Sequence, residues 1–251
     1  MPPLPVQRAI GDVQFEYDLA GYHGTAPMYF GSYALLSVEA IRRFLRPGGI
    51  FIDVGANIGY LSAVAANCVG PLGQVHAFEP VPRYFSRLKA LADRNPNFTI
   101  VANCCAAGEA NGSSRIFLTR EPGQNTIVPG YKSGAEILGI ETVATMRLDS
   151  YIRLQGLEEI SLIKIDAEGF ELPILRGLER YFASAAHRPV ILCEIAPRAY
   201  SLLGSRPHDL RDFMARFGYS AFDVIDAATP IDITTLSSVD DVLFLPSGIR
   251  R

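Results

Sequence analysis

The chain has 251 residues, of which 49% are apolar and 20% charged, and it carries a formal net charge of -3 with a pI near 5.8. These values are ordinary for a soluble globular protein and exclude a disordered or fibrous chain. The small negative charge gives no general attraction to phosphate backbones, so we expect no nucleic-acid partner. No signal peptide and no apolar run of roughly 20 residues is evident, so we expect a cytoplasmic protein without a membrane partner.

The length favours one large domain, or one domain with a short appendage. Residues 1–31 are rich in Pro, Gly and Tyr without sustained periodicity, which predicts an irregular or weakly β segment. From Ser32 to Leu45 apolar residues recur at helical spacing, and Ser32 can cap this helix. We therefore divide the chain into residues 1–47, an N-terminal segment and helix that pack on the core, and residues 48–251, the main domain.

Beyond this helix, strand-like and helix-like segments alternate. The expected strands of the sheet are residues 50–54, 74–78, 99–102, 162–165, 190–193, 221–225 and 242–245, with two further strand-like runs at residues 114–119 and 142–148. The expected helices are residues 58–68, 82–95, 172–182 and 207–217. Apolar strands separated by amphipathic helices are typical of a parallel sheet that is covered on both faces. The last two strands have no helix between them, so one should run antiparallel. The predicted fold class is α/β: a mostly parallel seven-stranded sheet with an antiparallel edge strand and helices on both faces.

The strongest local signal is Phe51-Ile52-Asp53-Val54-Gly55-Ala56-Asn57-Ile58-Gly59, an apolar strand that runs into a glycine-bearing turn and a helix. Glycine allows positive φ and lets a ligand approach the main chain at the carboxyl end of the strand. The pattern lacks the full G-x-G-x-x-G of a dinucleotide site, and Asp53 would not favour a pyrophosphate. S-adenosylmethionine carries an ammonium and a sulfonium, so the turn favours a methyl donor over NAD.

Glu79 ends the second strand about twenty residues after the glycine turn. A carboxylate there can accept both ribose hydroxyls of an adenosine, in NAD enzymes and methyltransferases alike. Glu79 therefore indicates a nucleoside and not a particular chemistry. Taken alone it would more often be a solvated loop residue, and the turn at Asp53 is what favours the functional interpretation.

The motifs that follow one another along the chain are Asp53-Val54-Gly55-Ala56-Asn57-Ile58-Gly59, Phe78-Glu79-Pro80, Asn103 with Ala106-Ala107-Gly108, Leu148-Asp149-Ser150-Tyr151, Ile163-Lys164-Ile165-Asp166-Ala167-Glu168-Gly169-Phe170-Glu171 and Cys193-Glu194-Ile195. In this order they resemble the FkbM family of S-adenosylmethionine-dependent methyltransferases, over about residues 32–246. The resemblance implies a class I, Rossmann-like methyltransferase domain at residues 48–251. One departure is Ala196, where many family members have His.

The resemblance also implies which residues contact the cofactor. The expected contacts are Asp53, Gly55, Asn57, Gly59, Glu79, Asn103, Ala106 and Asp166. Of these, Asp53, Gly55 and Asn57 would border the methionine part, Glu79 the ribose, and Asn103 with Ala106 the adenine. Magnesium is left open as a further cofactor, because some related sugar methyltransferases use it. Asp166, Glu168 and Glu194 would offer the oxygen ligands for such an ion, but we assign no metal ligand.

Asp166 and Glu168 would face the transferred methyl group and are the expected catalytic residues. Methyl transfer is an in-line displacement that gains from alignment and from removal of the acceptor's proton. Asp166 is the first candidate for that base and Glu168 the second. Alternatively the pair serves the start of the next helix, where carboxylates bind free backbone amides. Two other segments could close the site: the longest loop, residues 121–141, and the aromatic residues Tyr29, Phe30 and Tyr33.

The expected function is O-methylation of a hydroxyl on a small molecule, a sugar or a natural product, by a transferase of class EC 2.1.1.-. The alternatives are an N- or carboxyl-directed methyltransferase, a nicotinamide-dependent oxidoreductase and a non-catalytic relative that binds the cofactor. The acceptor and a homo-oligomeric state are left open, because loops build acceptor pockets and a fold does not dictate its substrate.

Overall fold

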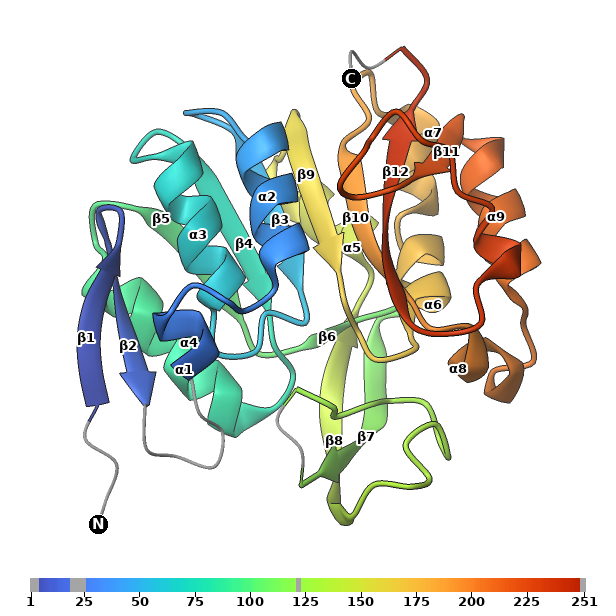
Figure 1. Cartoon of the computed structure of the whole chain (residues 1–251), viewed down its shortest axis with the longest axis horizontal. Helices are drawn as coiled ribbons and strands as arrows, with labels where there is room; N and C mark the ends of the chain where they lie inside the picture. Colours follow the sequence, from blue (N-terminus) through green and yellow to red (C-terminus); the bar gives the residue numbers. More distant parts are fainter. Residues whose placement is uncertain (1–4, 19–25, 121–122, 249–251) are drawn as a thin grey trace.

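The computed structural model describes residues 5–18, 26–120 and 123–248. Its centre is a seven-stranded sheet in the order β11-β12-β10-β9-β3-β4-β5 (Figure 1). The strands are β3 (Ile50–Val54), β4 (Gln74–Phe78), β5 (Thr99–Asn103), β9 (Ile160–Ile165), β10 (Val190–Ile195), β11 (Tyr219–Phe222) and β12 (Asp240–Pro246). The five strands from β10 to β5 are parallel. The predicted α/β, Rossmann-like fold with a mostly parallel sheet is therefore confirmed.

One detail of the predicted sheet is wrong: the antiparallel strand is not at the edge. β12 runs antiparallel to both of its neighbours and lies between β10 and β11, so β11 forms the edge. Burial explains this order. The side chains from Val242 to Pro246 in β12 are buried, whereas β11 has an exposed and a half-buried residue at its centre and is suited to an edge.

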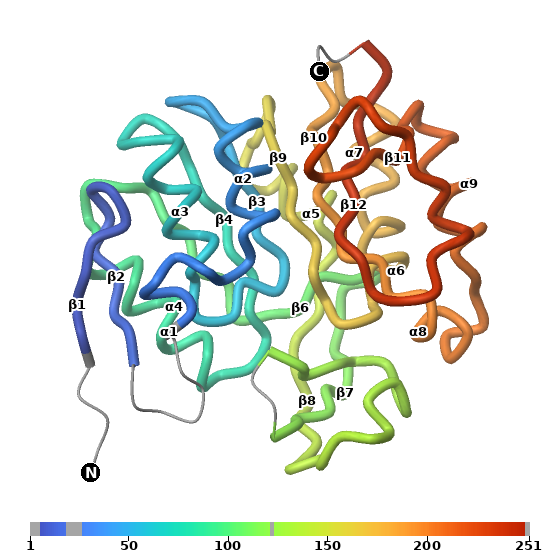
Figure 2. The backbone as a smooth tube through the Cα atoms, viewed as in Figure 1, coloured from blue at the N-terminus to red at the C-terminus, as the bar shows by residue number. Residues whose placement is uncertain are grey.

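Helices cover both faces of the sheet, and Figure 2 follows the chain from the N-terminal hairpin at one end of the sheet to α9 at the other. The first face packs against α2 (Leu35–Phe44), α3 (Tyr60–Val69) and α4 (Pro82–Arg94). The second packs against α5 (Leu148–Gln155), α6 (Glu171–Arg176), α7 (Glu179–Ser184) and α9 (Pro207–Arg216). In the described part of the chain, no helix combines the length and apolarity needed to span a membrane.

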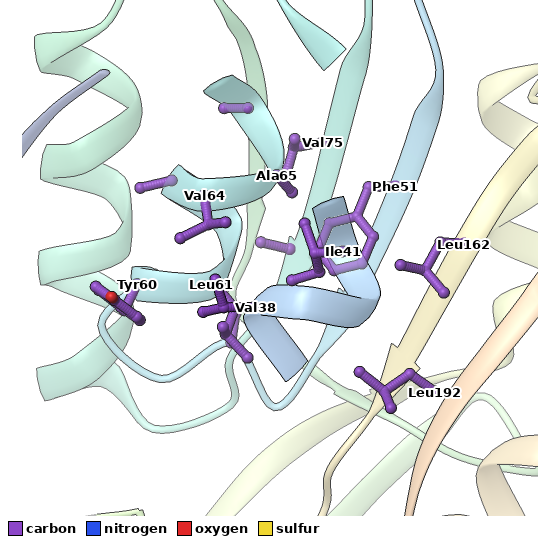
Figure 3. Close-up of a cluster of buried hydrophobic side chains, with 14 of the residues drawn as sticks. Val38, Ile41, Phe51, Tyr60, Leu61, Val64, Ala65, Val75, Leu162 and Leu192 are labelled. Atoms are coloured by element: carbon purple, nitrogen blue, oxygen red, sulfur yellow. The ribbon is translucent and has the colours of Figure 1, made fainter. Parts of the chain in front are cut away.

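The core of the first face lies where α2 and α3 pack over β3 and β9 (Figure 3). Ile41 from α2, Phe51 from β3 and Leu162 from β9 are fully buried there. Each such side chain contributes about 1.5–3 kcal/mol relative to exposure. This packing fixes α2 against the sheet, with Ser37 in its first turn at the candidate site.

Several local predictions differ from the structure. Ser32 does not cap α2, which begins at Leu35 after Ala34 in the left-handed region; the Ser32 hydroxyl donates to Pro27 O instead. The single helix expected at residues 172–182 is two helices, α6 and α7, with Gly177 between them. A Cβ on Gly177 would lie 2.2 Å from Gly108 O, so this close approach sets the break. Unpredicted elements are α1 (Ala26–Tyr29), α5 and α8 (Pro197–Leu202). The irregular or weakly β segment expected at residues 1–31 contains the hairpin of β1 (Pro5–Ile10) and β2 (Val13–Asp18).

A second, three-stranded sheet lies below the carboxyl ends of the parallel strands in Figure 1. It contains β6 (Ala106–Ala107), β7 (Gly112–Thr119) and β8 (Ile137–Met146), in the order β6-β8-β7. Of the loop expected at residues 121–141, residues 137–141 belong to β8 and residues 121–122 lie outside the described residues. The loop itself, residues 123–136, joins β7 to β8 and reaches the site.

Candidate active site

A cavity of about 310 Å³ lies at the carboxyl ends of β3, β4, β9 and β10. This is the edge at which open α/β sheets bind their ligands. The turn after β3 and Glu79 form one wall, and Asp166, Glu168 and Glu194 form another. The cavity therefore brings together residues that the sequence places more than a hundred positions apart.

The turn after β3 has a backbone that only glycine can adopt at its start. Gly55 has φ +78°, and a Cβ there would lie 1.8 Å from Asp166 O. The amides of Gly55 and Ala56 donate to Phe78 O at 3.1 and 3.0 Å, and the amide of Asn57 donates to Glu79 Oε2 at 2.9 Å. Gly55 and Asn57 thus line the cavity in a turn that is held at both ends.

Asp53 lies in the cavity wall with its carboxylate turned inward. It is 0% exposed, its Oδ2 accepts a hydrogen bond from the Ser62 hydroxyl at 2.6 Å, and its Oδ1 lies 3.6 Å from Lys164 Nζ. Asp53 lines the cavity, and its Oδ1 has no hydrogen-bond partner. The expected contact between Asp53 and the cofactor stays a prediction.

Lys164 is the charged residue that the sequence interpretation missed. Its Nζ lies 3.2 Å from Asp166 Oδ2 and 3.3 Å from Gly55 O, and Lys164 is directly opposite Asp53 on β3. Burial favours the neutral amine, but the carboxylates of Asp166 and Asp53 outweigh it and raise the pKa of Lys164, which stays charged. One signal was present: a single lysine within the apolar strand Ile160–Ile165 needs buried partners.

Glu79 is 6% exposed and binds the main chain through both oxygens. Its Oε1 accepts from the amide of Val81 at 2.8 Å, and its Oε2 accepts from Asn57 as described above. Burial raises the pKa of Glu79 to about 7, although these amides lower it. Glu79, the residue expected to meet the ribose, therefore also fixes the turn after β3, and its pKa lies near neutral pH.

Two of the expected cofactor contacts do not line the cavity. The side-chain amide of Asn103 donates inward, to Ala77 O at 3.1 Å and to Tyr151 Oη at 3.3 Å. Gly59, with φ +88°, allows α3 to approach α4, since a Cβ there would lie 2.7 Å from a Leu91 methyl carbon. Ala106, by contrast, lines the cavity as expected.

Asp166 and Glu168 reach the cavity, and neither caps the following helix. The side chain of Asp166 is 39% exposed and pairs with Lys164, while Glu168 Oε2 lies 2.7 Å from Lys132 Nζ. No side chain caps α6, and the amide of Gly169 donates to Glu171 at 2.8 Å. The helix-start interpretation of Asp166 and Glu168 is therefore wrong.

Two further carboxylates give the cavity an acidic wall: Glu194, which the sequence offered as a possible metal ligand, and Asp241, which the sequence interpretation missed. Glu194 and Asp241 are directly opposite each other on β10 and β12 and both line the cavity. Burial, then Asp166 and Glu168, raise the pKa of Glu194 to about 9. Among the described residues, no group of three His, Cys, Asp or Glu side chains could hold a metal ion, so no ligands can be assigned to magnesium.

The remaining walls come from the segment before α2 and from the β7–β8 loop. Tyr33 lines the cavity, whereas Phe30 is 76% exposed and Tyr29 packs edge-on against Tyr17. The loop contributes Gln124, Asn125 and Ile127 to the wall and is tied down at Thr126, whose hydroxyl donates to Glu168 O at 2.7 Å. Ala196 is buried against Val128 and Tyr131 in a separate small cluster.

Comparison with known proteins identifies relatives of the chain. The family model described as the methyltransferase FkbM domain matches residues 53–221. The 31-O-demethyl-FK506 methyltransferase FkbM of Streptomyces tacrolimicus is 31% identical over 161 residues, which are 54% of this chain and 61% of that protein. The hexuronic acid methyltransferase AglP of Haloferax volcanii is 29% identical over 126 residues, 50% of this chain and 48% of that protein. The matches thus span 61% and 48% of the length of these two relatives.

Among solved structures, the TehB-like SAM-dependent methyltransferase of Corynebacterium glutamicum superposes with a TM-score of 0.48 at 12% identity. The match covers 88% of this chain and 92% of that one.

Proposed function

Because the chain belongs to the FkbM methyltransferase domain family, we propose that it transfers the methyl group of S-adenosylmethionine to a hydroxyl of a small molecule. One observation carries the proposal. A single cavity at the carboxyl edge of the sheet has a glycine turn beside a buried carboxyl group on one wall and a row of carboxylates on the other. The first wall suits a nucleoside, and the second suits a positively charged donor.

The residues present fit S-adenosylmethionine. A Cβ on Gly55 would collide with the main chain at Asp166 O, so the turn can adopt this conformation beside the cavity only with glycine. Glu79 would accept the ribose hydroxyls, Asn57 and Gly55 would border the methionine part, and Ala106 would border the adenine. Glu194 Oε2 is buried without a hydrogen-bond partner, and the acidic wall as a whole favours the positive charge of the donor.

The donor supplies an electrophilic methyl group, and the protein's own residues supply alignment and a proton acceptor. We assign the role of proton acceptor to Asp166, whose carboxylate is the more exposed of the two predicted catalytic residues. We assign Glu168 the role of positioning the acceptor. The acceptor's O–H bond breaks as its oxygen bonds to the methyl carbon, and the C–S electron pair stays on sulfur. General base help of this kind contributes about 10²–10⁴-fold in rate.

The names of two relatives support a hydroxyl-bearing acceptor. One names a 31-O-demethyl compound, and the other names a hexuronic acid, which carries hydroxyl groups as well as a carboxyl group. An oxidoreductase site would need a Tyr–Lys pair, but Tyr151 bonds to His76 at 2.8 Å in the core of the other face, away from Lys164.

Calorimetric titration with S-adenosylhomocysteine, followed by transfer of a labelled methyl group to a panel of acceptors, tests the proposal. We expect S-adenosylhomocysteine and S-adenosylmethionine to bind and NAD not to bind, with label appearing on hydroxyl-bearing sugars or natural products. Label only on amines or carboxylic acids would contradict O-methylation. Binding without transfer to any acceptor would indicate a non-catalytic relative, and binding of NAD alone would overturn the whole assignment.

A further inference from the structure

We propose that Lys164 is a positioning residue that links the turn after β3 (residues 55–57, the donor turn) to the carboxylate of Asp166. Its ammonium group holds the Gly55 carbonyl and the Asp166 carboxylate in one fixed arrangement. This inference rests on the proposed function for its catalytic consequence. It rests on geometry alone for the link itself, which is present without any ligand.

Three oxygens surround the Lys164 ammonium, and they come from different parts of the site. Asp166 Oδ2 lies at 3.2 Å and Gly55 O at 3.3 Å, both within hydrogen-bonding reach, and Asp53 Oδ1 lies at 3.6 Å. Two of the three N–H donors of the lysine thus have hydrogen-bond acceptors, and Asp53 Oδ1 is an ion-pair partner without a hydrogen bond of its own. Asp53 is itself held by Ser62, which fixes the position from the helix side.

The buried Lys164 matters more for the relative position of Gly55 and Asp166 than for the stability of the fold. A buried ion pair often stabilises a fold no more than apolar side chains of similar volume would, because both charges lose their hydration. What the charge adds here is a link between two segments that touch different reactants. Gly55 lies in the turn that borders the donor, and Asp166 faces the acceptor, so a shift of about 1 Å between them would misalign the in-line attack.

Other charged and titratable groups surround this link. Lys164 also acts electrostatically on Tyr33 and Glu79, and Asp166 acts on Glu168, Glu194 and Asp241. These carboxylates each repel the negative charge of Asp166. Lys164 is the cation paired with that carboxylate, so its removal would leave Asp166 without its ion-pair partner.

The test compares Lys164→Met, which removes the charge at similar length, with Lys164→Arg, which keeps it. Hydrogen exchange of the ligand-free protein comes first. Two protected amides report on the link: Gly55 N–H, bonded to Phe78 O, and Asp166 N–H, bonded to Val54 O. We expect both to exchange at least 10-fold faster in Lys164→Met, with the rest of the sheet unchanged, and Lys164→Arg to stay nearer to the wild type. Unchanged exchange at both amides would overturn the proposal.

Kinetics then test the consequence. In Lys164→Met we expect kcat to fall 10-fold or more, while affinity for S-adenosylhomocysteine changes less than threefold. Lys164→Arg should recover most of the lost kcat. An unchanged kcat in Lys164→Met, or a loss of affinity as large as the loss of kcat, would contradict the role. If Lys164→Met does not fold, Lys164→Gln carries the same measurements. A wild-type protein that binds no S-adenosylhomocysteine would refute the proposed function, while the exchange result would still decide on the link.

Discussion

Glu194 and Asp241 face each other across β10 and β12, so two carboxylates share one level of the sheet. Like charges in directly opposite positions destabilise a sheet. Within the described ranges neither forms an ion pair: Asp241 accepts a hydrogen bond from Ser37 at 3.3 Å, and Glu194 Oε2 has no hydrogen-bond partner. The strain is relieved in the ligand-free protein by a proton, because the pKa of Glu194 is raised to about 9.

The free energy of unfolding of the ligand-free protein should therefore fall as the pH rises from 7 to 8. The folded chain keeps the Glu194 proton in this interval, whereas the unfolded chain, with an ordinary pKa near 4.5, has released it. The folded state binds more protons, so stability is lost with rising pH, by at most about 1.4 kcal/mol per pH unit for one group. Burial lowers the pKa of His76 to about 4, so His76 is largely neutral in both states above pH 7.

Denaturant unfolding at several pH values measures this slope. Glu194→Gln should be more stable than the wild type at pH 8 and should reduce the slope to the smaller contribution of Glu79 and Glu171, whose pKa burial raises to about 7. Glu159→Gln, at an exposed position, should leave the curve unchanged. A Glu194→Gln curve as steep as that of the wild type would place the proton elsewhere.

Glu79 should make cofactor affinity depend on pH. Its pKa of about 7 means that the carboxylate, which accepts hydroxyl hydrogen bonds better than the acid does, is lost as the pH falls below 7. Affinity for S-adenosylmethionine and S-adenosylhomocysteine should fall with it. Glu79→Gln should weaken both ligands about 10-fold or more and remove this dependence, since a hydrogen bond to a charged group contributes about 1.5–3 kcal/mol. Weakening of only one ligand, measured by calorimetry, would mean that Glu79 senses the sulfonium.

Gly55→Ala should abolish cofactor binding and also lower the melting temperature. The added Cβ would lie 1.8 Å from Asp166 O, and the φ of +78° is unfavourable for any other residue. Gly130→Ala is a matched control, because Gly130 has a similar φ of +76° but open space around it. Thermal unfolding and calorimetry should show full binding in the control. Normal binding in Gly55→Ala would remove the donor turn from the site.

Much of this architecture could be predicted because it is local. The bounds of β3 and β4 follow from short apolar runs that end at a glycine or an acidic residue, and Pro82 begins α4 as expected. The order of β11 and β12 could not be predicted, since it depends on which strand the sheet can bury more completely. The break between α6 and α7 could not be predicted either, because it depends on the close approach of Gly177 to Gly108, which is distant in the sequence.

The candidate site likewise contains residues that could be predicted from the sequence and residues that could not. Gly55, Asn57, Glu79, Asp166 and Glu168 carry recognisable local patterns, and the cavity brings all five together. Sequence spacing cannot show what a neighbouring strand supplies. Lys164 opposite Asp53 and Asp241 opposite Glu194 depend on strand register, and the inward turn of Asn103 depends on Tyr151 from a helix on the other face.

Asp166 is the residue that acts in the chemical step of the proposed mechanism. The decisive measurement is single-turnover methyl transfer by Asp166→Asn, with labelled S-adenosylmethionine bound in advance and an acceptor that the wild type methylates. We expect the rate to fall about 10²-fold or more, the range for lost general base help, while the affinity for S-adenosylmethionine changes less than threefold. A normal rate in Asp166→Asn would contradict the mechanism, and a rate lost only in proportion to donor affinity would make Asp166 a binding residue.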